Sequence, residues 1–155
     1  MELTIRRAIK SDLEALAELF ADSVGQIAPQ QYSPQQVLAW ANSASDLESF
    51  GRSVFQGTIF VAETKGLLLG FGGIQDTGYL SHLYVRGDYH RQGIGSSLLA
   101  QIIKHARVCK LDRLYTEASE FSKLLFLKSG WELYAEEDVT RNNITFHRYL
   151  MQVFL

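Results

Sequence analysis

The sequence predicts a single α/β domain of the α+β type, in which six to seven strands form a mixed, mostly antiparallel sheet flanked by about four helices. Two observations support this fold class. The chain has 155 residues, of which 46% are hydrophobic and 12% aromatic, enough to build the core of one ordinary domain. Its apolar residues also change from helical to strand spacing near Thr58, and no internal repeat or Pro/Gly/Ser-rich linker divides residues 1–155.

The first third of the chain predicts one strand and two helices. Residues 2–8, ELTIRRA, alternate as a short strand does. Ser11 is a suitable N-cap for a first helix, and Ser33 opens a second one in YSPQQVLAWAN, with proline at the first helical position. Residues 43–56 fit either a weak helix or a loop. The first helix carries its apolar side chains at helical spacing, namely Leu13, Leu16, Ala17, Phe20 and Val24.

From Thr58 onward the pattern predicts strands interrupted by two helices. TIFVAET and LLLGFGGI flank the turn Lys65-Gly66 and fit an antiparallel hairpin. Then follow the strand GYLSHLYVRG, a helix with apolar Ile94, Leu98, Leu99, Ile102, Ile103 and Ala106, the strand DRLYTEA, the short helix SKLLFLKSG, and the strands WELYAEE and ITFHRYLMQV. The element order is βααβββαβαββ, which should place the strand at 80–85 next to that at 112–117, with the two separating near Val85.

Charge and cysteine content exclude several kinds of protein. Fifteen basic and seventeen acidic residues give a formal charge of −2, so no global charge favours nucleic acid or an anionic membrane as a partner. Cys109 is the single cysteine, which excludes an intramolecular disulfide and a cysteine-based zinc cluster and suits a reducing compartment. The first residues, MELTIRRAIK, lack the apolar core of a signal peptide. We therefore expect a cytoplasmic protein with no bound metal.

A glycine-rich turn between a strand and a helix is the main functional motif. In YHRQGIGSSLLAQIIKHA, Gly93 and Gly95 precede the predicted helix, and Arg86, His90 and Arg91 flank them. A helix N-terminus offers free N–H groups and the positive end of the helix dipole, which attract phosphate. Glycines let the backbone approach such an anion closely, although the same two glycines would also serve a tight turn with no ligand.

Two common phosphate loops do not fit this turn. A dinucleotide-binding fingerprint requires a third glycine where the chain has Leu98, and the Gly-Lys-Ser/Thr of a P-loop does not occur in the sequence. A nucleotide-binding α/β domain is therefore a weak alternative.

The stretch LYVRGDYHRQGIGSSLL resembles the acetyl-coenzyme A loop of the GNAT superfamily of N-acetyltransferases. That loop has the pattern Arg/Gln-x-x-Gly-x-Gly/Ala after a strand ending in Leu-x-Val, and His90 stands here at the usual Arg/Gln position. The predicted element order is similar to that of the superfamily over nearly the whole chain. YSPQQVLAW and TEAS…LFLKSGW resemble a bacterial branch of uncharacterised GNAT proteins.

The resemblance implies where acetyl-coenzyme A would bind. Its pyrophosphate would lie on the backbone N–H groups of Gln92 to Ser96, and its pantetheine arm along residues 83–85. In the later, more degenerate family pattern, Ser119 stands at an asparagine, Phe126 at the tyrosine that acts as acid, and Gly130-Trp131 at Gly-Phe. The implied cofactor-binding residues are Leu83, Tyr84, Val85, His90, Arg91, Gln92, Gly93, Ile94, Gly95, Ser96, Ser119 and Phe126.

The implied reaction is direct attack of an amine on the thioester, which requires a group that accepts the ammonium proton. Tyr79 and Ser81 lie six and four residues before the valine, where family members often place a base or a water-ordering group. His82 has a better intrinsic pKa, but simple alternation puts it on the opposite face from Ser81 unless the strand contains a bulge. Ordinary packing on the sheet surface would explain His82 equally well.

The acid that protonates the leaving thiolate is missing at its usual place, because Phe126 has no hydroxyl. Tyr84 and Tyr115 are possible substitutes, although tyrosine is common in strands for structural reasons. Other acidic residues within reach, Asp76 and Glu117, fit a loop and a strand end.

The sequence leaves the acceptor unidentified. By resemblance it would lie between the first two helices and the last strands, near residues 26–40 and 140–147. An acetyl-coenzyme A dependent N-acetyltransferase is the first hypothesis, and a catalytically silent acyl-coenzyme A binding sensor or regulatory module is the alternative. The apolar closing strand YLMQVFL also suggests a homodimer, since exposed apolar strand edges are usually covered; the tail could instead fold back on its own sheet.

Overall fold

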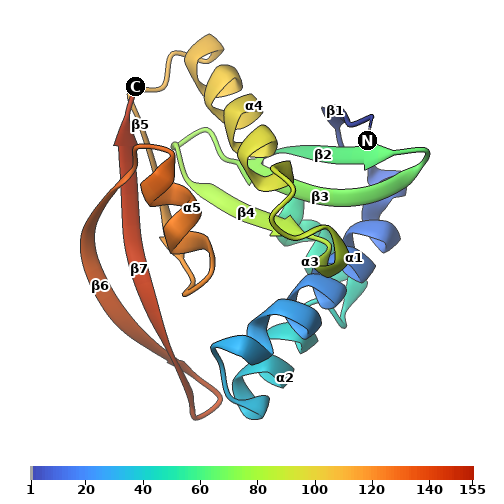
Figure 1. Ribbon diagram of the computed structural model, residues 1–155, viewed down its shortest axis with the longest axis vertical. Coiled ribbons are helices and arrows are strands. Elements are labelled where there is room, and N and C mark those ends of the chain that lie inside the picture. The colour runs from blue at the N-terminus through green and yellow to red at the C-terminus, as the bar shows by residue number, and fades with distance from the viewer. Residues whose placement is uncertain (1) are drawn as a thin grey trace.

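The computed structural model describes residues 2–155 and contains two antiparallel sheets that meet at one edge (Figure 1). The four-stranded sheet has the order β1-β2-β3-β4, and the three-stranded sheet has the order β5-β7-β6. The strands are β1 (Thr4–Arg7), β2 (Thr58–Thr64), β3 (Leu67–Ile74), β4 (Leu80–Val85), β5 (Arg113–Ala118), β6 (Glu132–Arg141) and β7 (Ile144–Phe154). The mixed α/β fold with a mostly antiparallel sheet is therefore confirmed.

Among residues 2–155, the hydrogen bonds that join the two sheets lie near the start of β4. Tyr79 and Tyr115 form a parallel bridge, and the Tyr115 N–H donates to the Gly78 carbonyl at 3.0 Å. The Thr116 hydroxyl donates to the Leu80 carbonyl at 2.7 Å. Beyond this point β4 pairs with β3 and β5 pairs with β7, so the two strands diverge toward Val85 (Figure 1). The predicted neighbours and their separation are both confirmed.

Helices cover the four-stranded sheet on both faces. α1 (Leu13–Ile27), α2 (Pro34–Asn42) and α3 (Leu47–Val54) lie on one side and α4 (Ile94–Val108) on the other, while α5 (Ser122–Lys128) packs near β6 and β7 (Figure 1). Within residues 2–155, no helix has both the length and the apolar character that crossing a membrane requires.

The helix α3 corrects the predicted order, which becomes βαααβββαβαββ. The segment 43–56 was ambiguous because it offers few apolar side chains. Asp46 caps the helix by accepting a hydrogen bond from the Ser49 N–H at 3.2 Å. Phe50 and Val54, one turn apart, are both buried against α1 and the sheet. Burial of these two side chains stabilises the helix, whereas the helix propensity of the segment alone did not decide between a helix and a loop.

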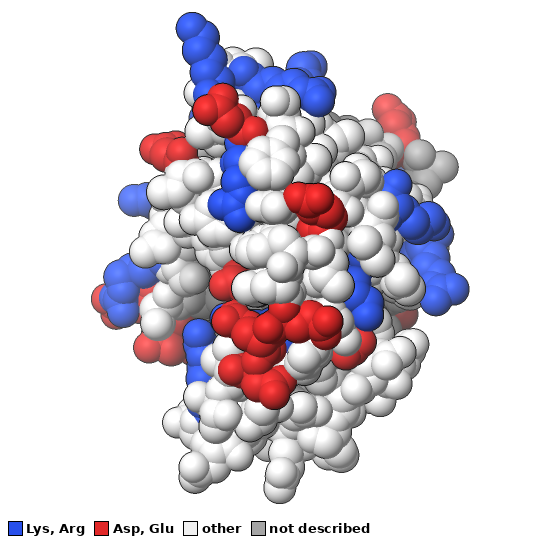
Figure 2. All heavy atoms as spheres, turned by 90° about the vertical axis from the view of Figure 1, so that its left-hand side faces the viewer, with Lys and Arg blue, Asp and Glu red and all other residues white. Residues whose placement is uncertain are grey.

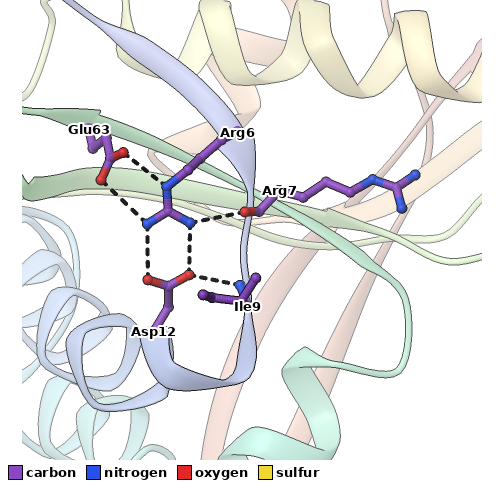
Figure 3. A network of polar contacts seen from close by, with 5 residues as sticks. All are labelled: Arg6, Arg7, Ile9, Asp12 and Glu63. Atoms are coloured by element: carbon purple, nitrogen blue, oxygen red, sulfur yellow. Dashed lines mark hydrogen bonds and ion pairs between the residues drawn. The ribbon is translucent and has the colours of Figure 1, made fainter.

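The start of α1 also differs from the prediction, because Ser11 is not its N-cap. A short 3₁₀ turn precedes the helix, and the residue at the cap position is Asp12. The Asp12 carboxylate accepts from the Ile9 N–H at 2.8 Å and from both terminal nitrogens of Arg6 at 3.0 Å (Figure 3). Arg6 also donates to Glu63 at 2.9 Å, and it holds the pKa of Asp12 below its usual range. This network ties β1 to both β2 and α1.

The C-terminal hairpin is longer than predicted. Asn142 and Asn143 adopt φ angles of 53° and 65°, the left-handed conformation that a tight two-residue hairpin turn requires. β6 therefore continues to Arg141 instead of ending near residue 137. Lys65 and Gly66, at φ 49° and 80°, form the same kind of turn between β2 and β3, as predicted.

The position of β7 removes the argument for a dimer. β7 is the central strand of its sheet, with β5 on one edge and β6 on the other, so the apolar tail folds back into the chain's own sheet. Its Met151 is fully buried in the core shared with α4 and α5. The closing strand is thus not a free apolar edge, and a homodimer stays a prediction without this support.

Candidate active site

A cleft of about 690 Å³ lies where β4 and β5 diverge. Its walls come from these two strands, the start of α4, the end of α1, α2 and α5. Most predicted site residues line it, namely Ser81, His82, Leu83, Tyr84, Val85, His90, Arg91, Gly93, Ile94, Gly95, Ser96, Ser119 and Phe126. Tyr79 and Gln92 lie outside this lining. The structure therefore brings together residues that the sequence placed on two strands and two helices.

A bulge in β4 changes the direction of the side chains in the middle of the cleft. His82 pairs with Gly73 and Leu80 pairs with Ile74, which leaves Ser81 as an extra residue in β4. The bulge breaks the alternation, so the Ser81 hydroxyl lies 2.9 Å from Nδ1 of His82. The sequence left open whether β4 contains a bulge that brings these two side chains together, and the structure contains one.

His82 lies in an apolar environment. Its ring centroid is 5.8 Å from that of Phe71 and 6.4 Å from that of Tyr84. Burial lowers the pKa of His82 to about 4, because a charged imidazolium is poorly solvated there. The ring is therefore neutral at neutral pH, and one of its nitrogens carries a lone pair that can accept a proton.

Tyr84 is enclosed by aromatic rings. The centroids of Phe20, Phe71 and Trp40 lie 4.7, 5.6 and 6.4 Å from its own. Burial raises the pKa of Tyr84, so its hydroxyl stays protonated and can serve as a hydrogen-bond donor. Burial, and then the carboxylate of Glu117, raise the pKa of Tyr79 as well. A phenol held in its protonated form is a poor base, which weakens that role for Tyr79.

The glycine turn forms the N-terminus of α4, as predicted. Gly93 precedes the helix at φ 81°, a conformation that glycine adopts without strain. The first helical hydrogen bond runs from the Ser97 N–H to the Gly93 carbonyl at 3.0 Å. The N–H groups of Ile94, Gly95 and Ser96 precede it and extend from the end of the helix. This end presents the three donors and the positive dipole that an anion requires.

Two contacts with α1 hold the segment before this turn. Arg86 donates to the carboxylate of Glu18 through two nitrogens, at 2.9 and 2.6 Å, and to the Leu68 carbonyl at 3.0 Å. The Gly87 N–H donates to Asp22 at 2.9 Å. The guanidinium lowers the pKa of Glu18. The loop that leads into α4 is thus fixed to a helix of the opposite wall.

Ser119 and Phe126 line the cleft, but each has a structural role as well. The Ser119 hydroxyl lies 3.1 Å from the Ser122 hydroxyl and accepts from the N–H of Ser122, the first residue of α5, at 3.2 Å. Phe126 is only 2% exposed, and its ring centroid is 4.7 Å from that of Trp131. Most of the Phe126 ring therefore belongs to the core.

Sequence reasoning missed the importance of Glu117. Instead of being a simple strand-end residue, it lines the cleft, and its Oε2 atom is buried. The available signal was its position in LYTEA, where a carboxylate stands in a strand whose neighbouring side chains are apolar or carry a hydroxyl group. Trp40 and Phe121 also line the cleft.

Comparison with known proteins places this geometry in a family. The model of the acetyltransferase (GNAT) domain matches residues 28–153. An uncharacterised N-acetyltransferase of Escherichia coli K12, YafP, is 27% identical over 150 residues, which cover 97% of this chain and 95% of that protein.

Two solved structures share the fold. The GCN5-related N-acetyltransferase of Rhodopseudomonas palustris has a TM-score of 0.95 at 24% identity and covers 100% of this chain and 97% of its own. The PaiA N-acetyltransferase of Thermoplasma acidophilum, solved in complex with coenzyme A, has a TM-score of 0.80 at 20% identity, with 100% of both chains covered. Since the family model spans most of the sequence, the chain belongs to the GNAT family of acetyltransferases.

Proposed function

We propose that this protein transfers the acetyl group of acetyl-coenzyme A to a primary amine by direct attack of the amine on the thioester. The observation that carries this proposal is the cleft itself, which has an open helix N-terminus at one end and a hydrogen-bonded Ser81–His82 pair on its strand wall. The similar PaiA structure contains coenzyme A, which supports the same class of donor here.

The donor would bind along β4 and the start of α4. Its pyrophosphate would accept hydrogen bonds from the N–H groups of residues 92–96, with Arg91 and His90 as additional donors. The backbone of residues 83–85 lines the cleft and would hold the pantetheine arm. An N–H of β4 near Val85 would then face the thioester oxygen and stabilise the oxyanion. No metal is part of the proposal.

The attacking nitrogen loses a proton as the new bond forms, and the Ser81–His82 pair is our candidate to accept it. Since His82 is neutral at neutral pH, it can accept a proton from the nitrogen directly or through Ser81 or a water molecule. Tyr84, whose pKa is raised, is the candidate donor to the leaving thiolate. A thiolate also leaves tolerably without such a donor near neutral pH.

The setting of the reaction is also part of the proposal. We propose a cytoplasmic location, which the single exposed cysteine, Cys109, supports because a reducing compartment keeps it a free thiol. Nucleic acid and membrane are not proposed as partners, because the net charge is only −2.

The test is an assay of free thiol released from acetyl-coenzyme A in the presence of a panel of primary amines, with the acetylated products identified by mass spectrometry. We expect release that depends on one or more amines and a matching acetylated product. The alternative, a silent acyl-coenzyme A sensor, predicts binding of the donor with slow hydrolysis that no amine accelerates.

A further inference from the structure

We propose that the acceptor is a small-molecule amine and not an amine carried by a polypeptide, because contacts made by Tyr32 and Gln36 close the side of the cleft that a chain would need to cross. This inference rests on the proposed acetyl transfer and assigns it an acceptor class. It arises from two hydrogen bonds and a group of aromatic rings that join the walls of the cleft.

The first hydrogen bond joins two loops that line different walls of the cleft. Gln30 and Gln31 lie between α1 and α2, and Glu120 lies between β5 and α5; all three line the cleft. The Glu120 N–H donates to the hydroxyl of Tyr32 at 2.9 Å. Tyr32 belongs to the first of these loops, so this bond connects the helical wall of the cleft directly to its β5 wall.

The loop that carries Glu120 is itself fixed to β7. Oε1 of Glu120 accepts from the Tyr149 hydroxyl at 2.6 Å, and Oε2 lies 3.9 Å from Nζ of Lys123. The same Nζ atom lies 3.9 Å from the centroid of the Tyr149 ring. The Glu120 carboxylate raises the pKa of Tyr149 to about 12, so this hydroxyl stays protonated and donates at neutral pH. The partner of Tyr32 is therefore held in place by the second sheet.

The second hydrogen bond joins α2 to the β6–β7 hairpin, which lie side by side (Figure 1). Nε2 of Gln36 donates to the Thr145 carbonyl at 2.8 Å. Oε1 of the same side chain accepts from the Ser33 N–H at 2.9 Å, which fixes the amide on the first turn of α2. The resemblance placed the acceptor between residues 26–40 and 140–147, and in the structure these two segments contact each other.

Aromatic rings from three parts of the chain pack around Tyr32. The ring centroids of Trp40, Phe121 and Phe146 lie 5.4, 6.1 and 6.2 Å from its own. Phe146 also packs against Trp40, with 6.4 Å between the centroids. Such contacts add to the stabilisation that burial of the rings provides. The closure therefore has an apolar centre and does not depend on hydrogen bonds at the surface alone.

A polypeptide cannot pass between walls that lie this close together. An extended chain needs about 4.8 Å on each side even when it pairs with a neighbouring strand, whereas the Tyr32–Glu120 and Gln36–Thr145 contacts measure 2.9 and 2.8 Å. The cleft of about 690 Å³ lies within the range of small-molecule sites, roughly 300 to 1,000 Å³, and the pantetheine arm of the donor would share it. A small amine fits the remaining space, and a chain that continues on both sides of its amine does not.

The acidic surface beside the cleft does not offer a basic peptide free carboxylates. Figure 2 shows acidic side chains gathered on the face that β6 and β7 present. Glu136 and Asp138 lie 2.7 and 2.8 Å from the two ring nitrogens of His147. Glu137 contacts the guanidinium of Arg148. These carboxylates already have partners within the chain, so a peptide would have to displace them in order to bind here.

The experiment compares small amines with the same amines carried by peptides. The small amines are n-butylamine and alaninamide, together with the panel of primary amines described above. The peptides are alanyl-lysyl-alanine blocked at both ends, whose lysine side chain ends as butylamine does, and trialanine amide, which presents an alanine at its N-terminus. For each compound kcat/KM is measured by release of free thiol from acetyl-coenzyme A, and the acetylated product is identified by mass spectrometry.

The proteins are the parent, the double variant Tyr32→Phe/Gln36→Glu and the control Tyr134→Phe. Tyr32→Phe keeps the ring and removes the oxygen that Glu120 bonds. Gln36→Glu keeps an oxygen for the Ser33 N–H and removes the donor to Thr145. Tyr134 is an exposed tyrosine of β6 outside the lining of the cleft.

We expect kcat/KM of the parent for its best small amine to exceed that for either peptide by at least about 100-fold, since the peptides are excluded by their chains. The double variant should reduce this preference by about ten-fold, because two hydrogen bonds between the walls are lost. It should bind acetyl-coenzyme A like the parent in calorimetry, because the end of α4 is unchanged. Tyr134→Phe should keep the preference of the parent.

Two results would overturn this inference. One is a parent that acetylates either peptide within ten-fold of its best small amine, a result that requires no variant to fold. The other is an unchanged preference in a folded double variant, which would show that these contacts do not select the acceptor. If the parent acetylates none of the compounds, the proposed function fails and this inference fails with it, whereas transfer to the peptides alone defeats only the inference.

Discussion

Acidification should destabilise this protein through His82, whose ring is held in its neutral form between Phe71 and Tyr84. The pKa of His82 is about 4 in the folded chain and about 6.5 when the chain is unfolded. Between these values the unfolded state binds the proton and the folded state does not. The free energy of unfolding therefore falls as the pH decreases from about 6.5 to about 4, and is unaffected by this residue above that window.

The size of the effect follows from the difference in pKa. Between pH 7.5 and pH 4.5 the His82 term should lower the free energy of unfolding by about 2 to 3 kcal/mol. The perturbation is His82→Gln, which removes the titrating group but keeps an amide that can bond Ser81. Urea unfolding at several pH values, with the parent and the variant measured side by side, isolates this term from the other titrating groups.

The parent should lose its stability advantage over His82→Gln as the pH falls, by the amount given above. A difference that stays constant from pH 7.5 to pH 4.5 would refute the claim that burial keeps the ring neutral. His147 provides a control of opposite sign, because Glu136 and then Asp138 raise its pKa. Its stabilisation is present at low pH and is lost as the pH rises through its folded pKa, so His147→Gln should cost stability only on the acid side.

Three further substitutions test the cofactor end of the cleft. Gly95→Val should weaken acetyl-coenzyme A binding at least ten-fold by calorimetry, because a Cβ at this position would already lie 3.1 Å from Leu125 and the branched side chain would cover the helix end. Binding equal to that of the parent would refute the proposed pyrophosphate site. Arg86→Gln should both lower stability by about 1 to 3 kcal/mol and weaken donor binding, since it frees the loop from Glu18 and Leu68; unchanged binding would show that the loop needs no anchor. Phe126→Tyr should lower the melting temperature and leave the acetylation rate within a few-fold of the parent's, because the ring is only 2% exposed. A ten-fold gain in rate would show instead that this ring faces the thioester sulfur, as the family resemblance implies.

The strands and most helices could be predicted because their signals are local. Ser33 and Pro34 at the start of α2, the turn Lys65-Gly66 and the apolar face of α4 each depend on residues a few positions apart. The third helix could not be predicted, because α3 is stabilised by burying Phe50 and Val54 against elements distant in sequence. Ser11 looked like a cap, but Asp12 stands at that position, and its carboxylate bonds Arg6, a residue of the neighbouring strand.

The helix end of the cleft was easier to predict than its strand wall. The glycine turn and the strand before it are contiguous in the sequence, so one motif identified the helix end and the cleft wall. The pairing of Ser81 with His82 depends on a bulge whose position is set by the register with β3, which alternation alone cannot locate. Glu117 lies beside Arg148 only because β5 pairs with β7, a contact between residues distant in sequence.

The most direct test of the central claim is mass spectrometry of the acceptor after incubation with the protein and acetyl-coenzyme A, with free thiol measured in the same samples. The claim that this cleft transfers acetyl to an amine predicts an N-acetylated product that appears in equal amount to the released thiol and is much reduced with Gly95→Val. Thiol release that no amine increases, with no acetylated product from the parent protein, would contradict it.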